Sequence, residues 1–220
     1  ISVLITSTTF LWINFFYMAT QDIIFAAIIN FGILCSMKAF RSKNNNYFFF
    51  SGLWIGLAVM LKTYLTVIPL LAILPFLISS KIIRNKFFWV GILIGFIPFL
   101  IWSIKIISMY GFIVFSGLYS KLITLSKNNN FTNPFFYYLW NLPANTFPWS
   151  LFSIIGFINI SKSSNNFKNY FLFKYPLIVM ILLSIFSTKT PYYPLQIISL
   201  LSINSFLGIY YISRKQNLIR

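Results

Sequence analysis

The amino-acid sequence predicts an all-α polytopic membrane protein, and three observations lead to this fold class. Apolar residues make up 59% of the 220 residues, and charged residues make up only 8%. Apolar runs repeatedly reach or approach the roughly 20 residues that an α-helix needs to cross a bilayer core. The basic residues, which give a net charge of +16, fall in short clusters between these runs. Such clusters are typical of the loops of membrane proteins, so we expect no nucleic-acid binding.

About eight transmembrane helices are expected. The third and fourth spans are short and are separated only by Lys62 and Thr63, which leaves a tight hairpin or one long, bent element. The hairpin is favoured because the charge of the loops then alternates correctly between the two sides. In chain order the expected spans are residues 1–18, 22–39, 47–61, 64–80, 87–108, 146–160, 175–188 and 194–212.

The distribution of positive charge predicts the orientation of these spans. Four segments that would share one side each carry a cluster of Lys and Arg: residues 38–46, 81–86, 161–174 and the C-terminal tail. The positive-inside rule places them, and both ends of this chain, in the cytoplasm. The other basic residues fall on or near the opposite side, and they are Lys62, Lys105, Lys121, Lys127 and Lys189.

Residues 1–220 are accordingly expected to form a single transmembrane domain. An outer segment over residues 109–145 would carry short amphipathic helices, and a second outer segment covers residues 187–196. Asp22 and Lys62 would end at the same outer face as these two segments. The sequence therefore predicts one composite site on that face.

The acidic residues limit the chemistry of such a site. Asp22 is the only Asp or Glu in the chain, which also contains no His. A catalytic carboxylate pair, a Ser/His/Asp triad and a carboxylate-and-His metal cage each need residues that this chain lacks. The remaining chemistry uses one acid and several lysines. No cofactor is predicted, and a single carboxylate without His gives no support for a divalent metal.

Three charged residues have both a structural and a functional interpretation. Asp22 opens the second span, where it would be a helix N-cap, a functional acid at the membrane edge, or both. Lys62 ends the third span, where it would either extend to the lipid headgroups or hold a phosphate as a point charge. Lys105 is expected only to extend to the headgroups.

The two outer segments contribute aromatic and basic side chains. Tyr137 lies in the run NPFFYYLW over residues 133–140, whose aromatics would be interfacial belt residues or would line a cleft above the bilayer. In the run STKTPYYPLQ over residues 187–196, two prolines make a rigid, non-helical entry. This run would either be a structured turn without a ligand or present donors to an anionic group, from Lys189, Tyr192 and Tyr193.

Two pairs of glycines recur at a spacing of four residues inside the apolar runs. They are Gly52-Leu-Trp-Ile-Gly56 and Gly91-Ile-Leu-Ile-Gly95. Small residues at this spacing let membrane helices approach closely. We interpret both pairs as packing elements only.

Four sequence elements occur in a characteristic order. An Asp opens an outer-to-inner span, Gly-Leu-x-x-Gly-Leu-Ala-x-x-x-Lys ends at Lys62, Pro-Phe-x-Tyr-Tyr-Leu leads to Pro-Trp, and Thr-Lys-x-Pro-Tyr-Tyr-Pro follows. In this order and sidedness, the chain from about residue 19 to residue 205 resembles the GT-C membrane glycosyltransferases. It is most similar to the protein O-mannosyltransferase and lipid A aminoarabinose transferase group.

The resemblance implies an inverting glycosyltransferase whose donor is a polyprenyl-phosphate-linked sugar and whose acceptor is a lipid, a protein or a glycan. In bacteria the transfer would take place on the outer face of the cytoplasmic membrane, with membrane lipids around the site. Lys62 and Lys189 would stabilise the negative charge that develops on the lipid phosphate. Asp22 would act as the base on the acceptor hydroxyl, and Tyr137, Tyr192 and Tyr193 would bind substrate.

The same family has an important acidic residue in a large outer loop that precedes the span with which this sequence begins. We therefore expect the first helix and the main catalytic acid to lie upstream, and Asp22 to match the family's second acidic position. Residues 1–220 alone need not be active. Two other classes stay open: a flippase, polymerase or other transporter of lipid-linked glycans, and a noncatalytic membrane subunit. The polar residues gather at the outer face rather than deep in the spans, which favours the enzyme.

Overall fold

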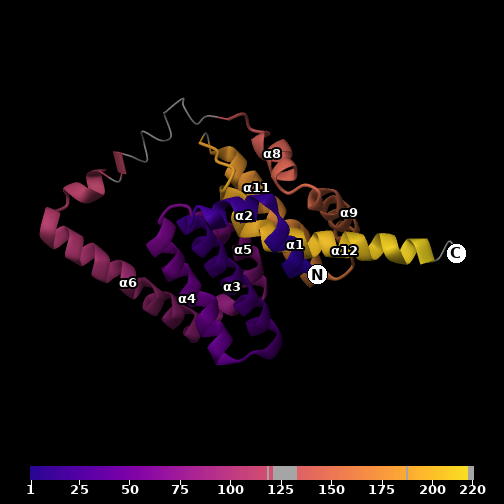
Figure 1. The fold of residues 1–220 in the computed structure, drawn as a ribbon. Coiled ribbons are helices and arrows are strands. Elements are labelled where there is room, and N and C mark those ends of the chain that lie inside the picture. The colour runs from indigo at the N-terminus through magenta and orange to yellow at the C-terminus, as the bar shows by residue number, and fades with distance from the viewer. Residues whose placement is uncertain (118, 121–132, 187, 218–220) are drawn as a thin grey trace. The chain divides into compact units, whose positions relative to one another are not determined.

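The computed structural model describes residues 1–117, 119–120, 133–186 and 188–217, and these are mostly helical, with no strand among them (Figure 1). The predicted all-α class is confirmed. Lys121 and Lys127 lie outside the described residues. The longer helices are α1 (Ser2–Thr8), α2 (Phe10–Tyr17), α3 (Gln21–Ser42), α4 (Asn45–Lys62), α5 (Val67–Ser79), α6 (Lys86–Tyr110), α8 (Tyr137–Asn145), α9 (Trp149–Ser161), α11 (Tyr175–Ile185) and α12 (Ile198–Asn217). The short ones are η1 (Ile82–Arg84), α10 (Asn166–Asn169), the π-helical η3 (Tyr170–Lys174) and η4 (Tyr193–Ile197).

Within the described part of the chain, four helical stretches are long and apolar enough to cross a membrane. They are Gln21–Ser42, Lys86–Tyr110, Asn166–Ile185 and Tyr193–Arg214. Two shorter apolar helices, α5 and α9, accompany them. The third and fourth predicted spans are two separate helices, because α4 ends at Lys62 and α5 begins at Val67.

The expectation of one helix over residues 1–18 is wrong, because the structure ends α1 at Thr8 and begins α2 at Phe10. Thr9 between them is extended, with φ −72° and ψ 126°. Its hydroxyl donates to the carbonyl of Ile5 at 2.7 Å, and other hydroxyls in the run Thr6–Thr9 also donate to main-chain carbonyls. A run of such side chains competes with the helical hydrogen bonds, which explains the break.

The expected start of a span at residue 175 is also wrong, because helical structure already begins at Asn166. The side chain of Asn165 accepts a hydrogen bond from the backbone N–H of Lys168 and so caps the first turn. α10, η3 and α11 then continue one another to Ile185. Lys168 and Lys174, expected in a loop, therefore lie on this helix.

Contacts divide the chain into two compact units. The first unit comprises Ile1–Ala26, Pro134–Ile185 and Thr190–Arg220, and the second comprises Ala27–Asn133 and Phe186–Lys189. Helix α3 gives its first residues to the first unit and the rest to the second.

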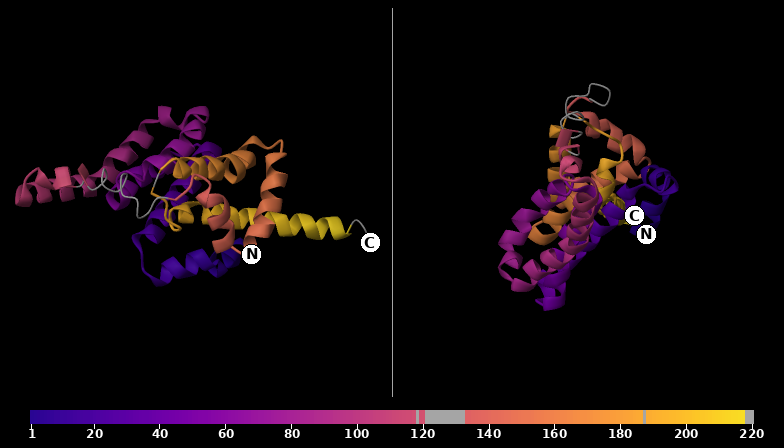
Figure 2. Two further views of the ribbon diagram at one scale, coloured as in Figure 1. Left: turned by 90° about the horizontal axis from the view of Figure 1, so that it is seen from above. Right: turned by 90° about the vertical axis from the view of Figure 1, so that its left-hand side faces the viewer.

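The second unit is built on the close packing of α4 along α6, which lie side by side in both Figure 1 and Figure 2. The predicted glycine pairs form this contact. A Cβ atom on Gly91 would meet the carbonyl oxygen of Phe49, and one on Gly56 would meet the backbone of Gly95. The two helices therefore touch backbone to backbone, which only glycine permits.

The glycine contacts also fix the direction of the two helices. Gly52 faces Phe88, whereas Gly56, one turn further along α4, faces Gly95. Residue numbers rise together, so α4 and α6 are parallel and both begin at the same end of the unit. The segments 38–46 and 81–86, which precede these helices, consequently share that end, as the alternation of loop charge predicted.

The first unit contains a hydrogen bond that compensates for a proline within a helix. Pro176 has no N–H to offer the carbonyl of Leu172, four residues earlier. The amide of Asn204 on α12 donates to that carbonyl at 2.7 Å, and Asn204 is completely buried. Hydrogen bonds between polar groups are favoured in an apolar environment, and this bond joins α12 to η3.

The glycine contact predicts a position-specific loss of stability. Gly91→Ala should lower the free energy of unfolding by about 1–3 kcal/mol, because the added methyl group meets the Phe49 carbonyl and forces the helices apart. Gly117→Ala is the matched control, since a Cβ there has nothing within 4 Å. Thermal unfolding in detergent, followed by circular dichroism, measures both. Equal stability of the two variants would contradict the packing.

The proline compensation predicts a rescue. Asn204→Leu should cost about 1–3 kcal/mol, because it removes the buried hydrogen bond to the Leu172 carbonyl. Pro176→Ala restores a backbone N–H near that carbonyl, so the double variant should lose less than the sum of the two single losses. Asn159→Leu, which removes a bond only to Ile155 on the same helix, is the control and should show no such coupling to Pro176→Ala. Strict additivity with Asn204→Leu would exclude the compensation.

Candidate functional site

Asp22 lies in the first turn of α3 and is only 6% exposed. It is not the N-cap residue that one interpretation expected, because α3 already begins at Gln21. The turn before the helix contains Ala19 with φ 50°, a left-handed conformation that is uncommon for any residue except glycine. A carboxylate in the first turn is stabilised by the positive end of the helix dipole. The chain's one acid is thus held inside the protein, at the start of a helix long enough to cross a membrane.

The tyrosines of the two outer segments meet in the first unit. The Tyr138 hydroxyl donates to the carbonyl of Thr190 at 3.1 Å. The centroid of the Tyr192 ring lies 5.3 Å from that of Phe15 on α2 and 5.1 Å from that of Tyr193. Both pairs of rings pack edge to face. The segments around residues 138 and 190, about fifty positions apart in the chain, therefore form one aromatic surface with α2.

Helix α8 presents two different faces within this surface. Tyr137, Tyr138, Asn141 and Leu142 are buried, whereas Leu139 and Trp140 are exposed. This division agrees with the amphipathic helix expected in the outer segment. Burial raises the pKa of the Tyr138 hydroxyl, and the neighbouring tyrosines shift it in the same direction. Burial also raises the pKa of Tyr137. Both hydroxyls consequently stay protonated at neutral pH, and that of Tyr138 is the donor to Thr190.

Lys189 belongs to the second unit and is almost fully buried, with 4% exposure. Its ammonium group donates to the carbonyl of Asn133 at 3.0 Å and to that of Phe186 at 2.6 Å. The Asn133 amide donates back to the Lys189 carbonyl at 3.1 Å. Burial lowers the pKa of Lys189. One of its three N–H donors thus joins Lys189 in the second outer segment to Asn133 in the first, and another bonds to Phe186 nearby in the chain.

Lys62 is the last residue of α4 and is partly buried. It stands at the opposite end of α4 from the basic segment 38–46. The turn behind it is closed by Thr66, whose N–H and hydroxyl both donate to the Lys62 carbonyl. An apolar hollow of about 380 Å³ begins beside this turn at Thr63 and Thr66 and runs between α4, α5 and α6.

The predicted site residues are divided between the two units. Lys62 and Lys189 belong to the second unit, and the others belong to the first: Asp22, Tyr137, Tyr192 and Tyr193. The structure places Tyr192 against Phe15 and joins the two outer segments through the Tyr138–Thr190 hydrogen bond. A single composite site that contains all six residues stays a prediction.

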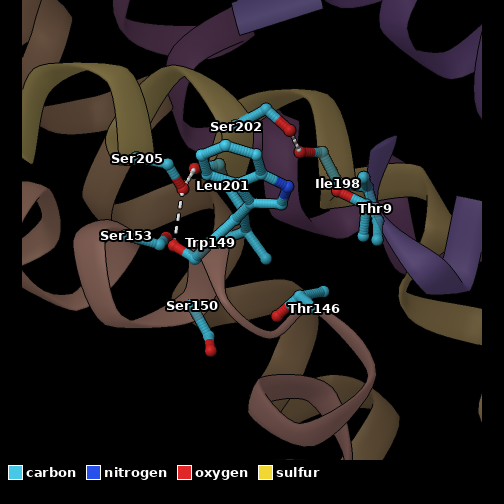
Figure 3. A pocket seen from close by; sticks show the side chains of 9 residues that line it. All are labelled: Thr9, Thr146, Trp149, Ser150, Ser153, Ile198, Leu201, Ser202 and Ser205. Atoms are coloured by element: carbon cyan, nitrogen blue, oxygen red, sulfur yellow. Dashed lines mark hydrogen bonds between the residues drawn. The ribbon is translucent and has the colours of Figure 1, made fainter. Parts of the chain in front are cut away.

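A small hollow in the first unit is lined by hydroxyl groups from α9 and α12 (Figure 3). Ser205 donates to the carbonyls of Trp149 and Leu201, and Ser202 donates to that of Ile198. The hollow has a volume of about 10 Å³, close to what a single water molecule requires. A sugar ring cannot enter it, so it is a polar contact between helices rather than a substrate site.

The class of protein follows from the fold and the composition. The long apolar helices define an all-α integral membrane protein. Residues 1–103 match the model of the dolichyl-phosphate-mannose-protein mannosyltransferase family. This match confirms, over that part of the chain, the resemblance to GT-C membrane glycosyltransferases, and it supports a membrane glycosyltransferase of the mannosyltransferase type. No curated protein and no solved structure matches the chain.

The matched part of the chain contains Asp22 and Lys62, whereas Tyr137 and the segment with Lys189 follow it. In the described residues no three His, Cys, Asp or Glu side chains come together to hold a metal ion.

Sequence reasoning did not single out two residues of the run over residues 133–140, Tyr138 and Asn133. Tyr138 donates a hydrogen bond to the main-chain carbonyl of Thr190, and Asn133 donates one to that of Lys189. A main-chain acceptor leaves no signature in the sequence. The only available signal was the position of both residues within the same aromatic run as Tyr137.

The carbonyl contacts of Lys189 predict a local effect of its removal. Lys189→Met should weaken the junction between the outer segments by about 2 kcal/mol, since it removes the charge-assisted hydrogen bond to the Asn133 carbonyl. Hydrogen–deuterium exchange should then become roughly 30-fold faster in peptides around residues 133–138 and 188–192. Lys105→Met is the control because Lys105 is exposed on α6. Unchanged exchange in Lys189→Met would mean that the hydrogen bond from Lys189 to Asn133 does not stabilise the junction between the outer segments.

Proposed function

We propose that this protein transfers a sugar from a polyprenyl-phosphate-linked donor to a lipid, protein or glycan acceptor at the outer face of a membrane. The observation that carries the proposal is the burial of Asp22 in the first turn of α3, inside the region that matches the mannosyltransferase family. An ionisable group buried at the edge of a membrane span is costly, and such groups mark functional sites by default.

The reaction needs a base and a means of stabilising the leaving group. The acceptor hydroxyl attacks the anomeric carbon, the bond from that carbon to the phosphate oxygen breaks, and polyprenyl phosphate departs with the bonding electrons. The proton of the hydroxyl passes to a carboxylate, which is the role of Asp22 in a direct, inverting displacement.

Lys62 is the residue proposed to hold the donor phosphate. Its ammonium is a point charge of the kind that binds phosphates. The apolar hollow that starts at Thr63 supports this role, because a prenyl chain needs an apolar surface next to the phosphate site. The lining of the hollow between α5 and α6, with Leu70, Leu74 and Ile92, suits such a hydrocarbon chain.

Lys189 and the tyrosines are each proposed to contact substrate. Lys189 keeps one N–H beyond its two carbonyl contacts, and Tyr137, Tyr192 and Tyr193 offer rings and hydroxyls for a sugar. Because Lys189 also orders the outer segments, we expect its substitution to affect both substrate affinity and the order of this surface.

Asp22→Asn should lower the rate of sugar transfer by about 100-fold or more, because the amide cannot accept the proton of the acceptor. The measurement is transfer of labelled sugar from a polyprenyl-phosphate donor in membranes that contain the protein. Lys62→Met should also lower transfer, whereas the control Lys105→Met should not. Circular dichroism of the purified variants checks that each still folds.

Full transfer in both Asp22→Asn and Lys62→Met would remove these residues from the site. Movement of a lipid-linked glycan across the membrane without any sugar transfer would favour a transporter instead.

A further inference from the structure

A basic hollow of about 610 Å³ lies at the end of the second unit where α4 and α6 begin. Lys43, which follows α3, lines it from one connection. Lys81 and Arg84, which follow α5, line it from another. All three side chains are exposed, and the aromatic residues Phe40 and Phe48 also line the hollow. Cations from two separate loops, nearly forty residues apart in the sequence, are thus brought together.

No acidic side chain of the second unit neutralises these cations. The sequence of Ala27–Asn133 and Phe186–Lys189 contains no Asp or Glu, and Asp22 belongs to the first unit. Three like charges around one hollow repel each other unless an anion is bound between them. The hollow therefore has the charge of an anion site whose counter-ion comes from outside this unit.

The backbone at this hollow is independently unusual. Lys43 has φ 52° and Lys81 has φ 59°, so both adopt the left-handed conformation. Each follows the C-terminus of a helix, a position at which glycine is preferred because it lacks a Cβ atom. Two lysines thus occupy strained positions beside the same hollow. Strained positions of this kind cost free energy and cluster at functional sites.

We propose that this basic hollow binds the phosphate of an anionic phospholipid headgroup through Lys43, Lys81 and Arg84. The positive-inside rule places this end of the unit at the cytoplasmic leaflet, where anionic headgroups attract basic residues next to membrane spans. Phe40, which is 45% exposed and packs edge to face on Phe76 at 5.8 Å, provides an apolar wall of the kind found at membrane interfaces. A lipid would contact both the basic side chains and Phe40, whereas a soluble anion would contact only the basic side chains.

The strained lysines permit an experiment that separates binding from folding. Lys43→Gly and Lys81→Gly each remove a cation and place glycine where the backbone favours it. Without lipid, each variant should have a Tm equal to or higher than that of the unaltered protein. Phosphatidylglycerol, titrated into the detergent-solubilised protein and followed by native mass spectrometry, should bind each variant at least 10-fold more weakly. Arg84→Gln should weaken binding similarly, and the control Lys105→Gln should not.

Three further ligands identify the source of the phosphate. Phosphatidylcholine, which has the same phosphodiester but no net charge, should bind at least 10-fold more weakly than phosphatidylglycerol. Inorganic phosphate and glycerol phosphate should displace the lipid only poorly. Equal binding of phosphatidylglycerol to all variants, or equal binding of the two lipids, would overturn the proposal. Tight binding of inorganic phosphate that displaces the lipid would show a soluble anion as the ligand and would overturn the assignment to a lipid.

Discussion

Helices in an apolar environment must pair their backbone polar groups within the protein, and this chain must do so with a single carboxylate side chain. Ion pairs between helices are therefore scarce by composition. The structure joins its helices in two other ways. Glycines bring the backbones of α4 and α6 into direct contact, and the amide of Asn204 donates to the carbonyl of Leu172, four residues before Pro176. The remaining architecture of each unit depends on these contacts.

The glycine contact has a consequence at both ends of the second unit. Because α4 and α6 are parallel, the two connections that precede them meet and form the basic hollow around Lys43 and Lys81. At the other end of α4, Lys62 stands beside the apolar hollow. One helix thus separates a basic hollow from an apolar one.

Most of the helices could be predicted from the sequence, because apolar runs of sufficient length have few alternatives in a membrane. The helix bounds were predicted wrongly where side chains form hydrogen bonds with the backbone. The hydroxyls of Thr6–Thr9 break the first helix, and Asn165 starts another helix before its apolar run begins. In the candidate site, Tyr192 and Tyr193 were expected in a non-helical run, but a 3-10 helix begins at Tyr193 and leads into α12. The burial of Lys189 was not expected, because its partners are main-chain carbonyls.

The sequence by itself determined the fold class, the close approach at the glycine pairs and the isolation of Asp22 as the only acid. These follow from composition and spacing, which act locally along the chain. Only the tertiary structure decided that Tyr138 bonds to Thr190, that Lys189 clamps Asn133, and that the two basic loops share one hollow. Each of these joins segments far apart in sequence through backbone atoms or loop geometry. Every residue has the same carbonyl group, so residue types alone cannot show which of them meet.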